Sequence, residues 1–222
     1  NLPIIHHQNK IIKKLKIFDN NKYLVGGYKH KNINVDDYKK IINSKYKNTN
    51  MLYSLFCAEK LIKDTLIISY GDIIYSENIL KKLINSKANI SVVVDSKWRL
   101  YWKARFKNPL IDAETLKLDK KSYITEIGLK TNTYRDIQGQ FIGLIKINKA
   151  GSKIFQNHYK NNKSFNGKNY KKAYMTDFLQ DLIINGYKIK AVETSSPWVE
   201  IDTTDDLKNP ITLKRLLKLS NE

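Results

Sequence analysis

The sequence predicts an α/β fold, with a Rossmann-like mixed, mostly parallel sheet that carries helices on both faces. Two observations predict it. Short segments that are almost continuously apolar alternate with patterns of helical period, and strands buried on both faces are typical of parallel sheets. The 222 residues, of which 41% are hydrophobic, suit one domain with a sizeable core. Because we see no internal repeat and no linker, we expect residues 1–222 to form a single domain.

The first half of the chain supplies most of this alternation. N-capping residues such as Asn34, Asn50 and Ser76 precede the expected helices. Apolar, largely β-branched runs such as TLIIS and ISVVV mark the strands. In chain order we expect a helix over 6–17, a strand over 22–27, helices over 35–43 and 51–62, a strand over 65–69, a helix over 76–86 and a strand over 90–94.

The second half is less regular. Residues 98–133 are aromatic and charged and indicate no long helix. The Asn/Lys-rich segment 160–172 indicates a mobile loop, either a solvated connector or a lid over a substrate. We expect further strands, some of them antiparallel, over 124–127, 140–147 and 189–193, and helices over 150–161, 174–185 and 205–219, the last interrupted near Pro210.

Charge, hydropathy and cysteine content exclude several classes of protein. Forty Lys and Arg residues against 21 Asp and Glu give a net charge of +19, but the lysines are spread over nearly every segment. A nucleic-acid binder would concentrate them, so we expect no nucleic-acid partner. No apolar run reaches the roughly 20 residues of a membrane span, so we expect no membrane insertion. The lone Cys57 excludes an internal disulfide and a cysteine-built zinc site, and it fits a cytoplasmic protein.

Two acidic segments predict a site for a divalent cation. In LIISYGDIIY (66–75), a buried strand delivers Asp72 at its carboxyl end, where open α/β sheets place their ligand crevice. A simple Gly-Asp turn explains this residue equally well. In PWVEIDTTDDL (197–207), Glu200 and Asp202 fall on one face of a strand and would repel each other without a cation. A helix-capping role would explain the acids after Asp202, but not this pair.

Two further segments could bind substrate groups. Thr49 and Asn50 precede an apolar helix, where they could bind an anion or a base edge, or merely cap the helix. Trp98, Trp102 and Arg105 fall at helical spacings, with acids following them. They could cage a cationic head group and hold a phosphate, or they could be aromatic packing with surface ion pairs.

Together these segments resemble the nucleotidyltransferases of the sugar-phosphate and phosphocholine cytidylyltransferase superfamily. The resemblance lies in YLVGGYK, NSKYKNTNMLYSL, LIISYGDIIY and WVEIDTTDDL. The segments VDSKWRLYWKARFKNPLIDAETL, ITEIGLK, IQGQFIGLIKI and YMTDFLQDLI resemble a branch that acts on small phospho- or phosphono-compounds in capsule and phosphonate assembly. That branch includes CTP:phosphoglutamine cytidylyltransferases.

The resemblance implies a GT-A-like nucleotidyltransferase fold and the transfer of CMP from CTP to a small phosphorylated or phosphonate acceptor, with release of pyrophosphate. It implies that Asp72, Glu200 and Asp202 hold Mg²⁺ as the catalytic set. The nucleotide-binding candidates are Thr49, Asn50, Ser54 and Gly71, and the acceptor-binding candidates are Arg105, Asp112, Glu114, Glu126, Lys130 and Gln140. Relatives are often homodimers.

One departure from the family pattern leaves alternatives open. The family opens with a strand and a glycine-rich signature, L-A-A-G-x-G-x-R-L, which grips the triphosphate. This chain starts with NLPIIHHQNKII, which resembles the segment after that signature. We therefore expect either that the signature precedes the sequence given or that the chain is an inactive nucleotide-binding relative. A sugar-1-phosphate nucleotidyltransferase is another alternative, whereas a glycosyltransferase would need a D-x-D motif that we do not find near Asp72.

Overall fold

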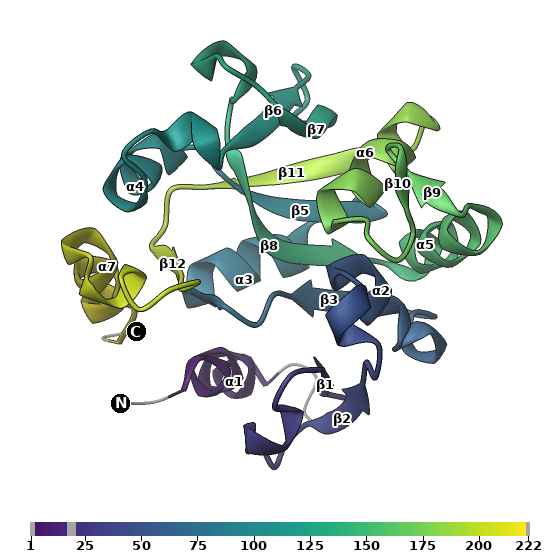
Figure 1. Cartoon of the computed structure of the whole chain (residues 1–222), viewed down its shortest axis with the longest axis horizontal. Helices are drawn as coiled ribbons and strands as arrows, with labels where there is room; N and C mark the ends of the chain where they lie inside the picture. Colours follow the sequence, from purple (N-terminus) through teal and green to yellow (C-terminus); the bar gives the residue numbers. More distant parts are fainter. Residues whose placement is uncertain (1–2, 17–20, 221–222) are drawn as a thin grey trace.

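The structure is a computed structural model that describes residues 3–16 and 21–220. Its centre is a four-stranded sheet in the order β11-β5-β8-β3 (Figure 1). The strands are β3 (Leu66–Ser69), β5 (Ile90–Asp95), β8 (Gln140–Ile147) and β11 (Ile189–Thr194). The α/β class, the mixed sheet and all four central strands are therefore as the sequence predicts.

The balance of strand directions differs from the prediction. Strand β11 pairs with β5 in parallel, but β8 lies antiparallel to both β5 and β3. An antiparallel strand among the later ones is as expected, but parallel pairs do not predominate, although β8 is buried along almost its whole length, like a parallel strand. Continuous burial follows from the layers that cover both faces of the sheet, and it does not report strand direction.

Helices cover both faces of this sheet, as predicted (Figure 1). Successive residues of β5 point to opposite sides, Val92 into one apolar cluster and Val93 into the other. The first cluster packs against α2 (Met51–Phe56), α5 (Lys149–Asn161) and α6 (Met175–Ile184), and the second against α1 (Ile4–Lys14), α3 (Glu77–Asn85), α4 (Trp98–Arg105) and α7 (Pro210–Ser220).

Four two-stranded pairs surround the central sheet. They are the parallel pair β1 (Tyr23–Gly26) and β2 (Lys39–Ile42), and the antiparallel pairs β4 (Ile73–Tyr75) with β12 (Trp198–Glu200), β6 (Glu114–Leu118) with β7 (Ile124–Lys130), and β9 (Ser164–Phe165) with β10 (Lys168–Asn169). Short 3₁₀ turns link several elements, at His30–Asn32, Tyr46–Asn48, Glu59–Leu61, Pro109–Ile111, Tyr134–Asp136 and Asp206–Lys208. The β4–β12 pair matters most for the site, because it joins the two acidic segments.

Three local predictions are wrong. The helix expected over 35–43 is instead strand β2, which pairs with β1 and whose two lysines are exposed. The helix expected over 51–62 ends at Phe56 and continues only as a 3₁₀ turn. The segment 160–172 is a hairpin rather than a loose loop, because Phe165 is fully buried and Asn166 and Gly167 take the positive φ angles of a tight turn.

Other boundaries are close to the predictions. The last helix begins at Pro210, directly after a 3₁₀ turn, which is the interruption that the proline indicated. Between 98 and 133 the chain forms the eight-residue α4, a 3₁₀ turn at Pro109–Ile111 and the β6–β7 pair, so no long helix occurs there. In the described part of the chain, none of the helices combines the length and hydropathy that a membrane span requires.

Candidate active site

The β4–β12 pair brings Asp72 beside the segment of Glu200. Glu200 pairs with Ile73 in the register, and the Ile201 amide donates a hydrogen bond to the carbonyl of Asp72 at 3.0 Å. Val199 is fully buried, and because side chains alternate along a strand, the Glu200 side chain points to the opposite face. The two acidic segments, which the sequence predicts to meet, are thus adjacent along this strand pair.

Asp72 carries an unusual carboxylate. Its Oδ1 atom is buried and has no hydrogen-bond partner among the described residues. Burial raises the pKa of Asp72, and the nearby charge of Asp202 contributes to the rise. A buried carboxylate oxygen without a partner is costly to the fold. It is a place where a bound cation would supply the missing interaction.

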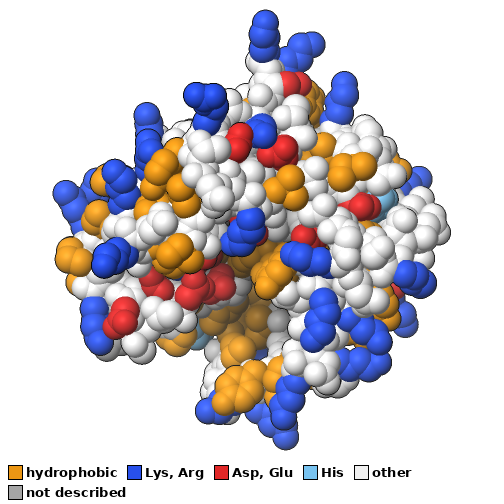
Figure 2. Space-filling model, turned by 45° about the horizontal axis from the view of Figure 1, so that its top comes forward, with side chains coloured by type: hydrophobic (Ala, Val, Ile, Leu, Met, Phe, Trp, Pro, Cys, Tyr) orange, Lys and Arg blue, Asp and Glu red, His pale blue; other side chains and the backbone are white. Residues whose placement is uncertain are grey.

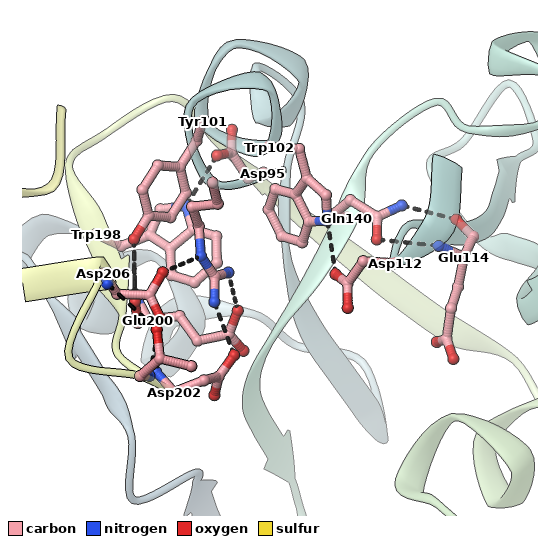
Figure 3. A network of polar contacts seen from close by, with 12 residues as sticks. Asp95, Tyr101, Trp102, Asp112, Glu114, Gln140, Trp198, Glu200, Asp202 and Asp206 are labelled. Carbon is pink, nitrogen blue, oxygen red and sulfur yellow. Dashed lines mark hydrogen bonds and ion pairs between the residues drawn. The ribbon is translucent and has the colours of Figure 1, made fainter. Parts of the chain in front are cut away.

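The acids at the end of β12 are held by one arginine. Arg105, the last residue of α4, donates to Glu200 Oε2, to Asp202 Oδ2 at 2.7 Å and to Asp206 Oδ1 at 2.9 Å (Figure 3). Its side chain is only 2% exposed. Burial alone would lower the pKa of Arg105, but the bonds to Asp206 and Glu200 raise it overall. We call Asp72, Glu200, Asp202, Asp206 and Arg105 the acidic cluster.

The backbone around this cluster is also fixed. The Tyr101 hydroxyl accepts a hydrogen bond from the Glu200 amide and donates one to the Glu200 carbonyl, each at 3.1 Å. Asp206 Oδ2 accepts from the amides of Asp202 and Thr203 at 3.1 and 2.9 Å. A cavity of about 390 Å³ opens beside Arg105, Asp202 and Asp206. Asp202 and Asp206 therefore border this cavity, and Arg105 lines it beside them.

The residues of the acidic cluster suit a divalent cation by their chemistry. Burial raises the pKa of Glu200 to about 7 against the opposing effect of Arg105, and Asp202 and Asp72 add to the rise. Crowded carboxylates of this kind gain from a cation, and carboxylate oxygens are the ligands that Mg²⁺ prefers. Arg105 uses Oε2 of Glu200 and Oδ2 of Asp202, which leaves the other oxygen of each outside that contact. Among the described residues no three metal-binding side chains surround one point.

The nucleotide-binding candidates lie around the start of α2 and in the loop after β3. The Tyr70 hydroxyl donates to the sulfur of Met51 at 2.8 Å, which joins the first residue of α2 to the loop after β3. Space beside Gly71 is open, since a Cβ there would meet no atom within 4 Å. Asn50 caps Met51, and it also donates to the Lys172 carbonyl. Its side chain is thus engaged by the protein, as the capping interpretation predicts.

Thr49 and Ser54 are joined by a residue that the sequence analysis did not select. The Nδ2 atom of Asn43 donates to both hydroxyl oxygens, each at 3.0 Å. Asn43 is buried at 1% exposure. It opens the NSKYKNTNMLYSL segment that carries part of the family resemblance, and its place at the start of that segment was the signal that could have identified it.

The β6–β7 pair brings together part of the acceptor-binding set. Glu114 lies opposite Lys130 in the register, and Gln140 bonds both backbone groups of Glu114. Burial raises the pKa of Glu114 to about 6, against a hydrogen bond with Thr176 and the charge of Lys130. The charge of Lys168, which pairs with Asp177 at 2.9 Å, also opposes this rise in the pKa of Glu114. We call Glu114, Lys130, Lys168 and Asp177 the arm cluster.

The remaining acceptor candidates have other partners. Asp112 accepts from Trp102 Nε1 at 2.9 Å, and Glu126 forms an ion pair with Lys117 at 3.0 Å. Arg105 is occupied by the acidic cluster. Trp98 and Trp102 are each 4% exposed and pack edge to face, which agrees with the packing interpretation of this segment rather than a cage. The contacts of these residues favour structural roles.

One face of the molecule shows how these parts are exposed. Figure 2 shows a hollow with apolar side chains inside it and acidic side chains along one rim. Lys and Arg side chains are spread over the visible face rather than gathered in one patch. This distribution agrees with the spread that the sequence predicts.

Comparisons with known proteins identify the family. No protein-family model matches the chain. A CTP:phosphoglutamine cytidylyltransferase of Campylobacter jejuni is 40% identical over 222 residues, which covers 94% of this chain and 87% of that protein. An inositol-1-phosphate CTP transferase from T. maritima has a similar structure, with a TM-score of 0.72 at 18% identity over 97% of this chain and 82% of that one.

A second solved structure agrees with this fold. A protein of Bacillus anthracis assigned as a glucose-1-phosphate thymidylyltransferase has a TM-score of 0.67 at 16% identity, over 100% of this chain and 85% of that one. At these identities the two structures indicate the fold alone, whereas the sequence relative indicates the family. The chain therefore belongs to the cytidylyltransferase family, within the nucleotidyltransferase superfamily.

Proposed function

We propose that this protein transfers CMP from CTP to a small phosphorylated or phosphonate acceptor and releases pyrophosphate. The observation that carries the proposal is the 40% identity to a protein named as a CTP:phosphoglutamine cytidylyltransferase. Phosphoglutamine is therefore the first acceptor to test. The geometry supports the proposal, because Asp72, with its unpartnered oxygen, lies on the strand pair that also carries Glu200.

The reaction requires the protein to position its substrates, and it requires no general base. An acceptor phosphate oxygen is already anionic, so it can form a bond to the α-phosphorus without losing a proton. The bond from that phosphorus to the β-phosphate oxygen breaks, and pyrophosphate leaves with the electron pair. The main obstacle is the repulsion between two polyanions, and catalysis reduces to alignment and charge neutralisation.

The acidic cluster supplies the residues for this task. Asp72, Glu200 and Asp202 would hold Mg²⁺, while Arg105 keeps the last two in place. When bound, Mg²⁺ would neutralise charge on the α-phosphate that the acceptor approaches. These carboxylates themselves repel a phosphate, so their role is to hold the cation and not the substrate.

The other candidates would hold the two substrates. Thr49, Ser54 and the open space at Gly71 would line the nucleotide site, with Asn50 fixing the start of α2. Glu114 and Lys130 would meet the acceptor, because together they offer one charge of each sign on the β6–β7 pair. Such a pair suits an acceptor that carries an ammonium group as well as an anion.

The test is release of pyrophosphate by the full-length protein with Mg²⁺. Each of CTP, UTP, ATP and GTP is paired with phosphoglutamine, phosphocholine, aminoethylphosphonate and glucose-1-phosphate. We expect CTP with phosphoglutamine to give the fastest release. Preference for a sugar-1-phosphate would favour a sugar nucleotidyltransferase, and no release with any pair would favour an inactive relative.

We further propose the setting of the reaction. CTP is a cytoplasmic metabolite, so the protein would act in the cytoplasm. The product would serve the modification of capsule or other surface polysaccharide, and the protein would work as a homodimer. Gel filtration with light scattering tests the last point directly.

A further inference from the structure

Two hydroxyl groups beside the candidate nucleotide site have a fixed hydrogen-bond polarity. We infer that Thr49 and Ser54 select cytosine over uracil, because both hydroxyls can accept a hydrogen bond from a ligand but have no proton left to donate. This inference deepens the proposed function and rests on it. Its evidence is the set of hydrogen bonds around Asn43.

The orientation of the Asn43 amide is fixed by the backbone. Its Oδ1 atom accepts from the Lys45 amide at 2.9 Å. A backbone N–H can only donate, so this contact identifies the oxygen of the amide and places Nδ2 on the other side. There Nδ2 donates to Thr49 Oγ1 and Ser54 Oγ. Both hydroxyl oxygens therefore act as acceptors toward Asn43.

The hydroxyl protons are used by the backbone as well. Thr49 donates to the Lys45 carbonyl at 2.9 Å, and Ser54 donates to the Asn50 carbonyl at 3.3 Å. Carbonyl oxygens only accept, so these directions are not interchangeable. A hydroxyl has one hydrogen and two lone pairs. After these contacts, each hydroxyl keeps a single lone pair for a ligand.

This polarity restricts what can bind. Triphosphate oxygens only accept hydrogen bonds, so these hydroxyls do not favour them. Cytosine carries an amino group at the position where uracil carries a carbonyl oxygen. Because the two hydroxyl oxygens already take both hydrogens of one amide NH₂, their spacing also suits the two hydrogens of a second amino group on their open side. Uracil would face two lone pairs, or would have to break an internal hydrogen bond.

The position of the pair is consistent with this role. Thr49 and Ser54 are both half-buried, so each has an exposed side. Met51, between them, accepts from Tyr70, the residue directly before Gly71 and Asp72. This contact links the start of α2, which lies between the two hydroxyls in the chain, to the segment that carries Asp72. Asn43 touches no ligand in this arrangement and is a positioning residue.

The experiment compares kcat/KM for CTP and UTP in pyrophosphate release. Thr49→Val and Ser54→Ala remove one acceptor each, and each should lower the CTP-to-UTP ratio about tenfold. Thr49→Ser keeps a hydroxyl and should keep the ratio. Thr65→Val is the matched control, because Thr65 is exposed and precedes β3 at the end away from Gly71.

Several results would overturn the inference. One is a wild-type protein that does not prefer CTP, and another is an unchanged CTP-to-UTP ratio in Thr49→Val and Ser54→Ala. A third is an equal loss of kcat/KM with both nucleotides, which would mean that the hydroxyls contact the sugar or the phosphates. If no acceptor supports turnover, calorimetric affinities for CMP and UMP give the same ratio independently of the proposed reaction. A protein that turns over CTP while its variants keep the ratio refutes this inference alone. Binding of neither nucleotide refutes both proposals.

Discussion

The acidic cluster and the arm cluster each gather several charged side chains, yet their charges are balanced differently. In the acidic cluster three acids bind one guanidinium, that of Arg105, and Asp72 lies near enough to feel its charge. In the arm cluster Glu114 and Asp177 lie among two lysines, Lys130 and Lys168. The first region has an excess of negative charge that a cation would offset. The second is balanced and suits a substrate that carries charges of both signs, which supports our proposal that metal and acceptor bind at separate places.

Removal of divalent metal should have the largest effect. Saturating EDTA should abolish pyrophosphate release, because the acidic cluster without a cation repels both phosphates. Excess Mg²⁺ should restore the activity. Turnover that survives saturating EDTA would contradict the division between the two regions.

Asp72→Asn should lower kcat by about a hundredfold or more, since a neutral amide binds the cation poorly. The stability of the folded protein should not fall. Folding raises the pKa of Asp72, so the ionised form costs stability at neutral pH, and the amide relieves that cost. Pyrophosphate release and thermal unfolding are the measurements. Asp64→Asn, at an exposed position before β3, is the control; wild-type turnover in Asp72→Asn would refute the metal assignment.

Arg105→Gln tests whether the guanidinium holds the acids together. It should destabilise the protein by about 3–5 kcal/mol, because three carboxylates lose the cation they share. Added Mg²⁺ should then raise Tm more in the variant than in the wild type, since a bound cation replaces part of the lost charge. Arg99→Gln removes an exposed arginine of the same helix and is the control. Equal Mg²⁺ shifts in variant and wild type would mean that Arg105 does not act on the metal ligands.

Glu114→Gln should raise KM for the acceptor about tenfold and leave KM for CTP unchanged. The pKa of Glu114 is raised to about 6, so in the wild type the carboxylate becomes protonated as pH falls through 6. Acceptor KM in the wild type should therefore rise below pH 6, and the variant should lose this step. Because folding raises this pKa from 4.5, the ionised form costs stability as pH rises from about 4.5 to 6, and Glu114→Gln should not destabilise the fold at pH 7. If acceptor KM depends on pH in the same way in the wild type and in Glu114→Gln, Glu114 does not bind the acceptor.

Glu126→Gln should have the smallest effect. Glu126 is already paired with Lys117 at the surface, and such pairs contribute about 0–1 kcal/mol. We expect acceptor KM within about twofold of the wild-type value and little change in Tm. A large rise in acceptor KM would extend the acceptor site beyond the arm cluster.

The features predicted best from the sequence are those that a local pattern of residues indicates. The central strands were found because their apolar runs are continuous, and Asp72 because it follows one of them. Strand β2 was missed because Lys39 and Lys40 are exposed and only its pairing with β1 makes it a strand. The β9–β10 hairpin was missed because a single buried residue, Phe165, fixes an otherwise polar segment.

The site divides in the same way. Glu200 and Asp202 are two residues apart, so their shared face could be inferred from strand geometry. Arg105 lies about a hundred positions before them, and no local pattern shows that the guanidinium would join them rather than a substrate. Asn43 was missed for a similar reason, because its role depends on the partners of hydroxyls and not on its own surroundings in the sequence.

The pairing of β4 with β12 also has a consequence for biosynthesis. Asp72 leaves the ribosome early, whereas Glu200 and Asp202 follow more than a hundred residues later. A nascent chain can fold much of its central sheet while Asp72 still waits for its strand partner. The acids therefore meet only after nearly all of the sequence given has been translated, and fragments that stop before β12 should not assemble the acidic cluster.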